Sequence, residues 1–227
     1  MINNPSAESI SDPLEIHRLF PPEVVCASAS ISDTPISLSL PEQMAVAHAA
    51  PHRRQEFALG RACAHKVLKQ LGCHNPVLVQ GHDGIPLWPS DIVGSITHTN
   101  TWCAVAAARS TTIQGIGIDV ETIERVSRRI AAKVMTPEEM LLIKQTTAED
   151  AQTMLCLVFS AKEAVYKCLY PVWHKKLRFH DATIIPHHAD GTFEALLRPA
   201  VIPHCQSLSG RYMIQQGIMC TGVMLPR

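Results

Sequence analysis

The chain has 227 residues, of which 46% are hydrophobic and 18% charged, and its 20 basic residues balance 20 acidic ones. This composition predicts a globular protein with a sizeable buried core. The lack of a basic excess argues against a nucleic-acid-binding protein, and no apolar run approaches the roughly 20 residues that span a bilayer.

Eight cysteines are present, but none forms a C-x-x-C pair, and the first 20 residues lack the basic start and apolar core of a signal peptide. We therefore expect reduced thiols, packed as small hydrophobic side chains in a cytoplasmic protein. The twelve histidines show no H-E-x-x-H spacing, so a histidine-ligated metal site is not predicted.

The first half of the chain predicts one long helix followed by strands. Residues 1–40 combine Ser and Pro with short apolar patches, which favours an extended lead-in that is partly strand. Apolar residues at helical spacing predict a helix over 53–71, which Gly72 ends. A short strand at 77–80 and a turn-rich segment at 82–86 follow. Three strands are then predicted, at 92–98, 102–108 and 113–120.

The second half predicts helices first and strands afterwards. Thr136, Pro137 and Glu139 form a helix start, because Thr caps the helix, Pro suits the first position and Glu completes a capping box. A second long helix is predicted over 151–169, closed by Pro171. Four further strands are predicted, at 182–185, 192–197, 212–215 and 218–225.

This repeated order of helices and strands predicts an α+β fold with two lobes. The lobes meet near residues 111–115. We therefore place the boundary between an N-terminal lobe of residues 1–112 and a C-terminal lobe of residues 113–227.

A pair of carboxylates lies in the segment 115–121, which has the sequence G-I-G-I-D-V-E. On a strand, Asp119 and Glu121 point to the same face. Adjacent carboxylates repel one another unless a cation, a proton or solvent offsets their charge, and a few carboxylates with water and phosphate suit magnesium. On this pattern alone, a strand end with two solvated acids is the commoner alternative.

A second charged group lies on the second long helix, where residues 159–167 have the sequence F-S-A-K-E-A-V-Y-K. Glu163 and Lys167 are four residues apart and share a helix face, so an ordinary surface ion pair is one explanation. The apolar neighbours instead favour partners inside the protein. If Glu163 faces Asp119 and Glu121, it completes a three-carboxylate magnesium site, with Lys167 one turn further on.

Two upstream segments carry groups that suit phosphate. Thr97 and His98 end a predicted strand and can hydrogen-bond a phosphate, although a hairpin with a structural histidine is the alternative. Arg54 and Arg61 lie on roughly one helix face, where they suit a terminal phosphate. A solvated basic face is the alternative there.

Together and in this order, these segments resemble the 4′-phosphopantetheinyl transferases. The paired signature is G-I-G-I-D-V-E, followed about forty residues later by F-S-A-K-E-A-V-Y-K. Upstream, R-R-Q-E-F and G-R, then P-L-W-P and G-S-I-T-H, resemble the branch associated with siderophore synthetases. The match covers roughly residues 50–170, and the combination is specific because several independent motifs coincide.

The resemblance implies two pseudo-symmetric lobes, each a small antiparallel sheet packed with helices, with the active site in the cleft between them. It also implies a soluble monomer that takes coenzyme A as substrate and acts on a helical carrier-protein domain. By this resemblance, Asp119, Glu121 and Glu163 would hold Mg²⁺, which bridges the coenzyme A pyrophosphate. His98 would contact that pyrophosphate, with Thr97 beside it.

By the same resemblance, Arg54 and Arg61 would lie nearest the 3′-phosphate of coenzyme A. Lys167 would neutralise charge on the transferring phosphate and its leaving group. One departure is visible. Many relatives have a basic residue just before the Pro of the G-x-P segment, and Ile85 stands there instead, which puts one nucleotide contact in doubt.

The predicted reaction is attack of a carrier-protein serine on the β-phosphate of coenzyme A, with release of adenosine 3′,5′-bisphosphate. Glu163, acting directly or through water, or a metal-bound water would be the base. The rivals are a magnesium-dependent phosphodiesterase and a non-catalytic coenzyme A-binding module. The candidate docking surface for an acidic carrier face consists of Arg125, Arg128, Arg129 and Lys133. A solvated helix face is the alternative explanation of these basic residues.

Overall fold

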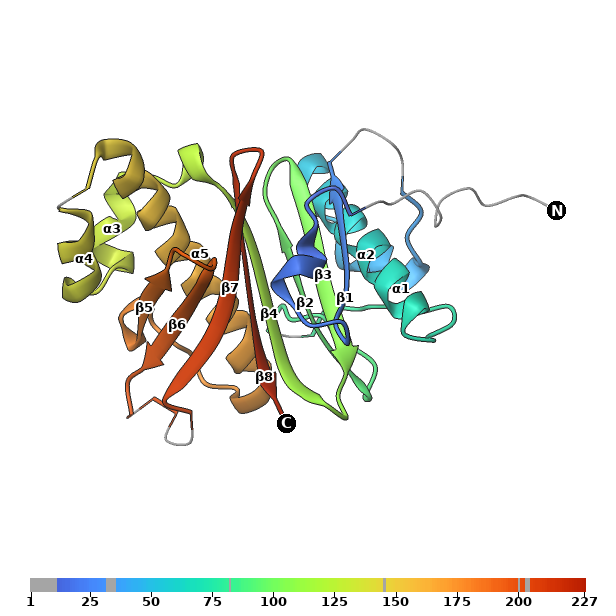
Figure 1. Cartoon of the computed structure of the whole chain (residues 1–227). Helices are drawn as coiled ribbons and strands as arrows, with labels where there is room; N and C mark the ends of the chain where they lie inside the picture. Colours follow the sequence, from blue (N-terminus) through green and yellow to red (C-terminus); the bar gives the residue numbers. More distant parts are fainter. Residues whose placement is uncertain (1–11, 32–35, 82, 145, 200, 203–204) are drawn as a thin grey trace.

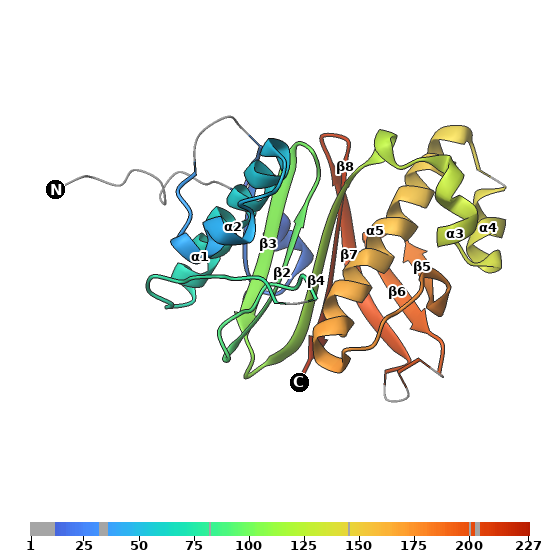
Figure 2. The same ribbon diagram turned by 180° about the vertical axis from the view of Figure 1, so that it is seen from behind.

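The computed structural model describes residues 12–31, 36–81, 83–144, 146–199, 201–202 and 205–227. This part of the chain forms two antiparallel sheets that lie side by side (Figure 1). A long helix packs against each sheet, and Figure 2 shows both helices from the other side. None of the described helices is long and apolar enough to cross a bilayer.

The first sheet has three strands in the order β1-β3-β2. Its strands are β1 (Val25–Ser30), β2 (Ile92–His98) and β3 (Trp102–Arg109). The helices α1 (Leu40–Ala45) and α2 (Pro51–Gln70) lie between the first strand and the second along the chain. Apolar residues of α2 and of β3 form a buried cluster, so α2 covers one face of this sheet.

The second sheet has five strands in the order β4-β8-β7-β6-β5. Its strands are β4 (Ile113–Thr122), β5 (Ala182–His187), β6 (Thr192–Leu197), β7 (Ser207–Gln215) and β8 (Ile218–Pro226). The long helix α5 (Ala148–Trp173) covers one face. Short helices lie before α5 and around it, namely η2 (Ile123–Arg125), η3 (Arg128–Ile130), α3 (Ala131–Val134), α4 (Pro137–Ile143) and η4 (Phe179–Asp181).

A third buried cluster joins the two sheets. It combines alternate residues of β3 with alternate residues of β4 and with the helix η1 (Ile16–Leu19). Because strand side chains alternate between faces, β3 gives Ala104, Ala106 and Ala108 to this cluster and Cys103, Val105 and Ala107 to the cluster with α2. The α+β fold predicted from the sequence, with two helix-packed antiparallel sheets, is therefore confirmed.

Most predicted elements lie close to their observed bounds, but several differ. The predicted strand at 77–80 is wrong: only an isolated bridge between Gln80 and Pro86 forms there. The turn predicted at 82–86 includes His82, which lies outside the described residues. Pro171 does not close the second long helix, which runs on to Trp173 because that side chain packs against the core. The helix α1 was not predicted, although Ser39 and Glu42 form a capping box around it.

Glu42 is a buried carboxylate that binds the backbone near residue 78. Its buried carboxylate accepts hydrogen bonds from Leu78 N at 3.0 Å and from the Ser39 hydroxyl at 2.7 Å, and contacts His65 Nε2 at 2.7 Å. Burial raises the pKa of Glu42, but these hydrogen bonds and the charge of His65 outweigh burial and lower the pKa below its ordinary 4.5. The carboxylate therefore ties α1 to α2 and to the loop that follows α2.

We expect Glu42→Gln to lower the free energy of unfolding by about 1–3 kcal/mol near neutral pH, because charged hydrogen bonds are lost inside the protein. The stabilisation depends on the ionised form, so it is present above pH 4.5 and is lost as pH falls through the lowered pKa. Urea denaturation of both proteins at neutral pH and below pH 4.5 measures this. A difference that stays constant with pH would contradict the assignment.

The strand β4 and the helix α5 approach one another unusually closely. A Cβ atom placed on Gly117 would lie 1.8 Å from the Ala164 carbonyl oxygen, and one on Gly115 would lie 2.5 Å from the Cys168 carbonyl oxygen. Only glycine allows backbone to meet backbone at this distance. The two glycines therefore fix how far the α5 side chains stand from β4.

We predict that Gly117→Ala lowers the free energy of unfolding by at least about 1–3 kcal/mol, because the added methyl group pushes α5 away from β4. The matched control is Gly60→Ala inside α2, where the new Cβ has 3.4 Å to Ile96 Cγ2 and fits. Urea denaturation compares the two variants. Equal stability of Gly117→Ala and the unmodified protein would show that the contact is not needed.

Candidate active site

The close contact of β4 and α5 places charged side chains from both elements in one site. Lys167 Nζ on α5 lies 2.6 Å from Asp119 Oδ1 on β4 and donates to Thr97 Oγ1 on β2 at 3.1 Å. The Thr97 hydroxyl in turn donates to Asp119 Oδ1 at 3.0 Å. Three elements that are distant in sequence therefore meet at Asp119, which is 2% exposed.

Three carboxylates at this point carry more negative charge than one lysine balances. Burial, then the charges of Asp119 and Glu163, raise the pKa of Glu121 to about 8, while Lys167 opposes the rise. Burial and the charge of Asp119 also raise the pKa of Glu163. Burial is the largest cause of both shifts, and the negative charge of Asp119 adds to it although Lys167 opposes it.

One oxygen of this group has no partner. Asp119 Oδ2 is buried and accepts no hydrogen bond from any described residue. An unpaired buried carboxylate oxygen is costly, so it marks a place where a cation fits. Asp119, Glu121 and Glu163 are thus the residues that could hold a divalent ion. These three carboxylates do not form a closed metal cluster, and neither does any other group of three His, Cys, Asp or Glu in the described residues.

His98 belongs to a second polar group, at the start of α2. Its Nε2 lies 2.5 Å from Arg53 Nη1, and its Nδ1 lies 3.7 Å from Glu56 Oε1. Glu56 also pairs with Arg53 at 3.2 Å and with His52 at 3.0 Å. Burial lowers the pKa of His98, with Glu56 opposing and Arg53 and Lys167 adding to the decrease. This group adjoins the carboxylate site because His98 follows Thr97 in β2.

The two arginines singled out from the sequence lie elsewhere on α2. Arg54 lines a hollow of about 720 Å³ beside α1, whose lining residues include none of the three carboxylates. Arg61 is buried, with its guanidinium 4.1 Å from the centre of the Phe57 ring, and burial lowers its pKa to about 10. Arg53, not its neighbour Arg54, is the arginine in contact with His98.

Sequence reasoning did not single out Arg53 or Glu56 as site residues. A signal for Glu56 was present, because it follows His52 by four residues and Arg53 by three on one helix face. No local pattern shows that this face meets His98, since the contact joins residues 45 positions apart.

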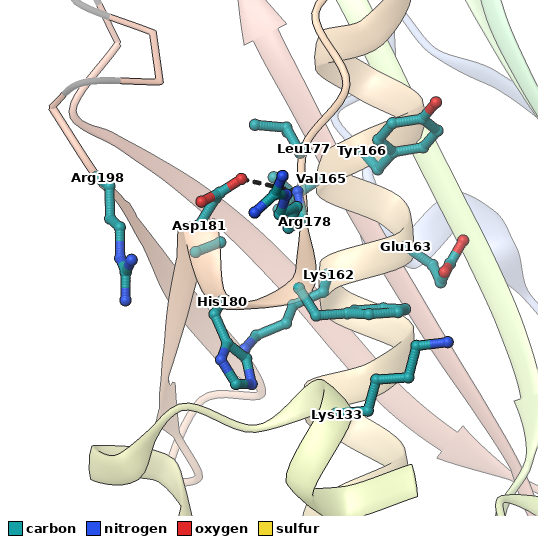
Figure 3. A pocket seen from close by; sticks show the side chains of 12 residues that line it. Lys133, Lys162, Glu163, Val165, Tyr166, Leu177, Arg178, His180, Asp181 and Arg198 are labelled. Atoms are coloured by element: carbon teal, nitrogen blue, oxygen red, sulfur yellow. Dashed lines mark hydrogen bonds between the residues drawn. The ribbon is translucent and has the colours of Figure 1, made fainter.

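A hollow of about 680 Å³ lies beside α5 (Figure 3). Figure 3 shows Glu163 on one side of this hollow and Asp181 and Arg198 on the other. Lys162 reaches its wall but is held by Glu139 at 2.7 Å and by the Val134 carbonyl at 2.8 Å. The remaining lining residues are mainly basic or apolar, namely Lys133, Val165, Tyr166, Leu177, Arg178, Phe179, His180 and Ala182.

Comparison with known proteins identifies the family. Residues 41–108 match the model of the 4′-phosphopantetheinyl transferase N-terminal domain, and residues 115–215 match that of the 4′-phosphopantetheinyl transferase superfamily. The 4′-phosphopantetheinyl transferase Svp of Streptomyces mobaraensis is 35% identical over 197 residues, which cover 84% of this chain and 80% of the relative. Npt of Nocardia iowensis is 30% identical over 194 residues, covering 80% and 86%.

A third relative bears on the predicted branch. Enterobactin synthase component D of Escherichia coli (strain K12) is 33% identical over 132 residues, which cover 57% of this chain and 61% of the relative. The family predicted from the sequence motifs is thus confirmed: the chain belongs to the 4′-phosphopantetheinyl transferase superfamily and has a siderophore-synthetase component among its relatives.

Proposed function

We propose that this protein transfers the 4′-phosphopantetheine group of coenzyme A to a serine of an apo carrier protein and releases adenosine 3′,5′-bisphosphate. The observation that carries the proposal is the meeting of Asp119, Lys167 and Thr97 beside two further carboxylates, in a chain of this family. The carrier would belong to nonribosomal peptide, polyketide or fatty-acid synthesis.

The two lobes have different roles in this proposal. Residues 1–112 supply contacts to coenzyme A, and residues 113–227 supply the metal site and the catalytic helix. The unpaired Asp119 Oδ2 and the raised pKa values of Glu121 and Glu163 support these three residues as ligands of Mg²⁺. When bound, Mg²⁺ supplies positive charge to the pyrophosphate of coenzyme A.

The chain's own cations bind and orient the phosphates. Lys167 would neutralise charge on the transferring phosphate, and its contacts with Asp119 and Thr97 beside the carboxylates support this role. Thr97 and His98 would contact the pyrophosphate, and Arg53 would join them through His98. Arg54 and Arg61 remain our candidates for the 3′-phosphate. The buried guanidinium of Arg61 supports this, since a buried cation favours an anionic partner.

At the β-phosphorus atom, the reaction forms one bond and breaks one. The serine oxygen bonds to the β-phosphorus of coenzyme A, and the bond from that phosphorus to the bridging oxygen breaks, leaving the electron pair on adenosine 3′,5′-bisphosphate. Glu163, directly or through water, or a metal-bound water would take the serine proton. The 680 Å³ hollow beside Glu163 has apolar and polar walls that suit the pantetheine arm.

The transfer reaction is tested with purified protein, coenzyme A, Mg²⁺ and two apo carrier domains, one from a peptide synthetase and one from fatty-acid synthesis. Intact mass spectrometry should show one added phosphopantetheine on at least one carrier, and chelation of Mg²⁺ should abolish the gain. Asp119→Ala should slow transfer by at least about a hundredfold, because both the lysine and the cation lose their partner. The matched control is Glu124→Ala, which removes an exposed acid nearby.

Two other outcomes would overturn this proposal. Cleavage of coenzyme A without modification of a carrier would show a phosphodiesterase, in which water replaces serine. Binding of coenzyme A without any cleavage would show a non-catalytic binding module.

We also propose that the carrier docks on the basic surface after β4. Arg125, Arg129 and Lys133 are exposed there, whereas Arg128 is held by Gln152 and the Ala148 carbonyl. The chain has no net charge, so attraction of an acidic carrier needs a local patch of this kind.

Reversing two of these charges, in Arg125→Glu/Arg129→Glu, should raise the KM for the carrier about tenfold and leave the KM for coenzyme A unchanged. Added salt should also raise the KM of the unmodified protein for the carrier. Steady-state kinetics with each substrate varied in turn measure both effects. Arg18→Glu, an exposed charge reversal on η1, is the control, and an equal effect in that variant would exclude the surface.

A further inference from the structure

Glu56 is a buried carboxylate whose partners are cationic or titratable side chains. Its side chain is 9% exposed and pairs with His52 at 3.0 Å, Arg53 at 3.2 Å and His98 at 3.7 Å. We propose that Glu56 is a positioning residue, which holds Arg53 and His98 in the arrangement that receives a phosphate of coenzyme A. The inference rests on the proposed function, since it assigns Glu56 to the same reaction.

The pattern of contacts separates Glu56 from a carboxylate that stabilises the fold. Glu42, the other buried glutamate on this side of the molecule, accepts hydrogen bonds from backbone N–H groups of Ser39 and Leu78. Among the described residues, Glu56 pairs only with side chains, namely those of His52, Arg53 and His98. A carboxylate that orders side chains and no backbone serves what those side chains bind.

The geometry also fixes the form of His98. Arg53 has only N–H donors, so the 2.5 Å contact requires His98 Nε2 to be an acceptor and the ring to be neutral there. The ring proton then lies on Nδ1, which faces Glu56 Oε1. Glu56 thus holds the guanidinium that contacts Nε2 and places its negative charge near the opposite ring nitrogen.

Removing this carboxylate leaves the cations without a common partner. Arg53 is 46% exposed and would turn into solvent once its pairing with Glu56 is lost. His98 would lose the negative charge that lies near Nδ1. Both changes weaken binding of coenzyme A more than they slow the chemical step, because Glu56 itself touches no reacting atom.

The test is Glu56→Gln, which keeps the shape of the side chain and removes its charge. We expect the KM for coenzyme A to rise about tenfold and kcat to stay within about twofold, with the KM for the carrier unchanged. Glu56→Asp, which keeps the charge on a shorter side chain, should recover part of the loss. The matched control is Asp12→Asn, which removes another carboxylate–histidine pair, with His17, and should leave both KM values unchanged.

A double-mutant cycle separates positioning from a general effect on folding. On a logarithmic scale, the change in kcat/KM caused by Glu56→Gln should be less than about half as large in the His98→Ala background as in the unmodified protein. Full additivity, or a lowered melting temperature with kcat and KM for coenzyme A unchanged, would overturn the proposal.

Calorimetric titration with coenzyme A makes the inference independent of turnover. If the unmodified protein binds coenzyme A but modifies no carrier, the proposed function fails, while weaker binding by Glu56→Gln still supports the positioning role. Equal binding by the two proteins would overturn that role even if transfer is observed. No binding by the unmodified protein would overturn both.

Discussion

The contact between β4 and α5 at Gly115 and Gly117 is the constraint on which the site depends. A side chain at either glycine would overlap a carbonyl of the helix, so the strand backbone lies directly on α5. Asp119 follows on the same strand face, and the helix then presents Lys167 at 2.6 Å from its carboxylate. In the segment 115–121, Gly115 and Gly117 thus let the strand backbone lie against α5, and Asp119 and Glu121 then supply the negative charge of the site.

The buried ion pair of Lys162 and Glu139 is compensated, which distinguishes it from the carboxylates of the site. Lys162 is 2% exposed and Glu139 fully buried, and each satisfies the other together with nearby backbone groups. At the site, by contrast, Glu121 and Glu163 have raised pKa values and Asp119 Oδ2 has no partner among the described residues. Carboxylates that lack such compensation suit a cation and a phosphorylated ligand.

Local patterns in the sequence predicted elements well and contacts between elements poorly. The strands 92–98 and 192–197 were predicted with the observed bounds, and the Thr136–Glu139 capping box formed, because alternation and capping depend on neighbouring residues. The sequence motifs placed Lys167 near the carboxylates of β4, but its direct pairing with Asp119 was not predicted. The choice of Arg53 over Arg54 as the contact of His98 depends instead on how α2 is rotated against β2, which no local spacing encodes.

The strand β2 contacts β4 of the second sheet through side-chain hydroxyl groups and not through backbone strand pairing. Ser95 Oγ accepts a hydrogen bond from Ile118 N at 3.2 Å, and Thr97 Oγ1 accepts one from Val120 N at 3.4 Å. Because these hydroxyls are two residues apart, they share one face of β2, while His98 on the other face meets Arg53. The same strand therefore fixes the position of β4 and carries contacts from α2 toward Asp119. A shift of α2 relative to β2 would consequently alter the phosphate-binding side chains without disturbing the carboxylates on β4.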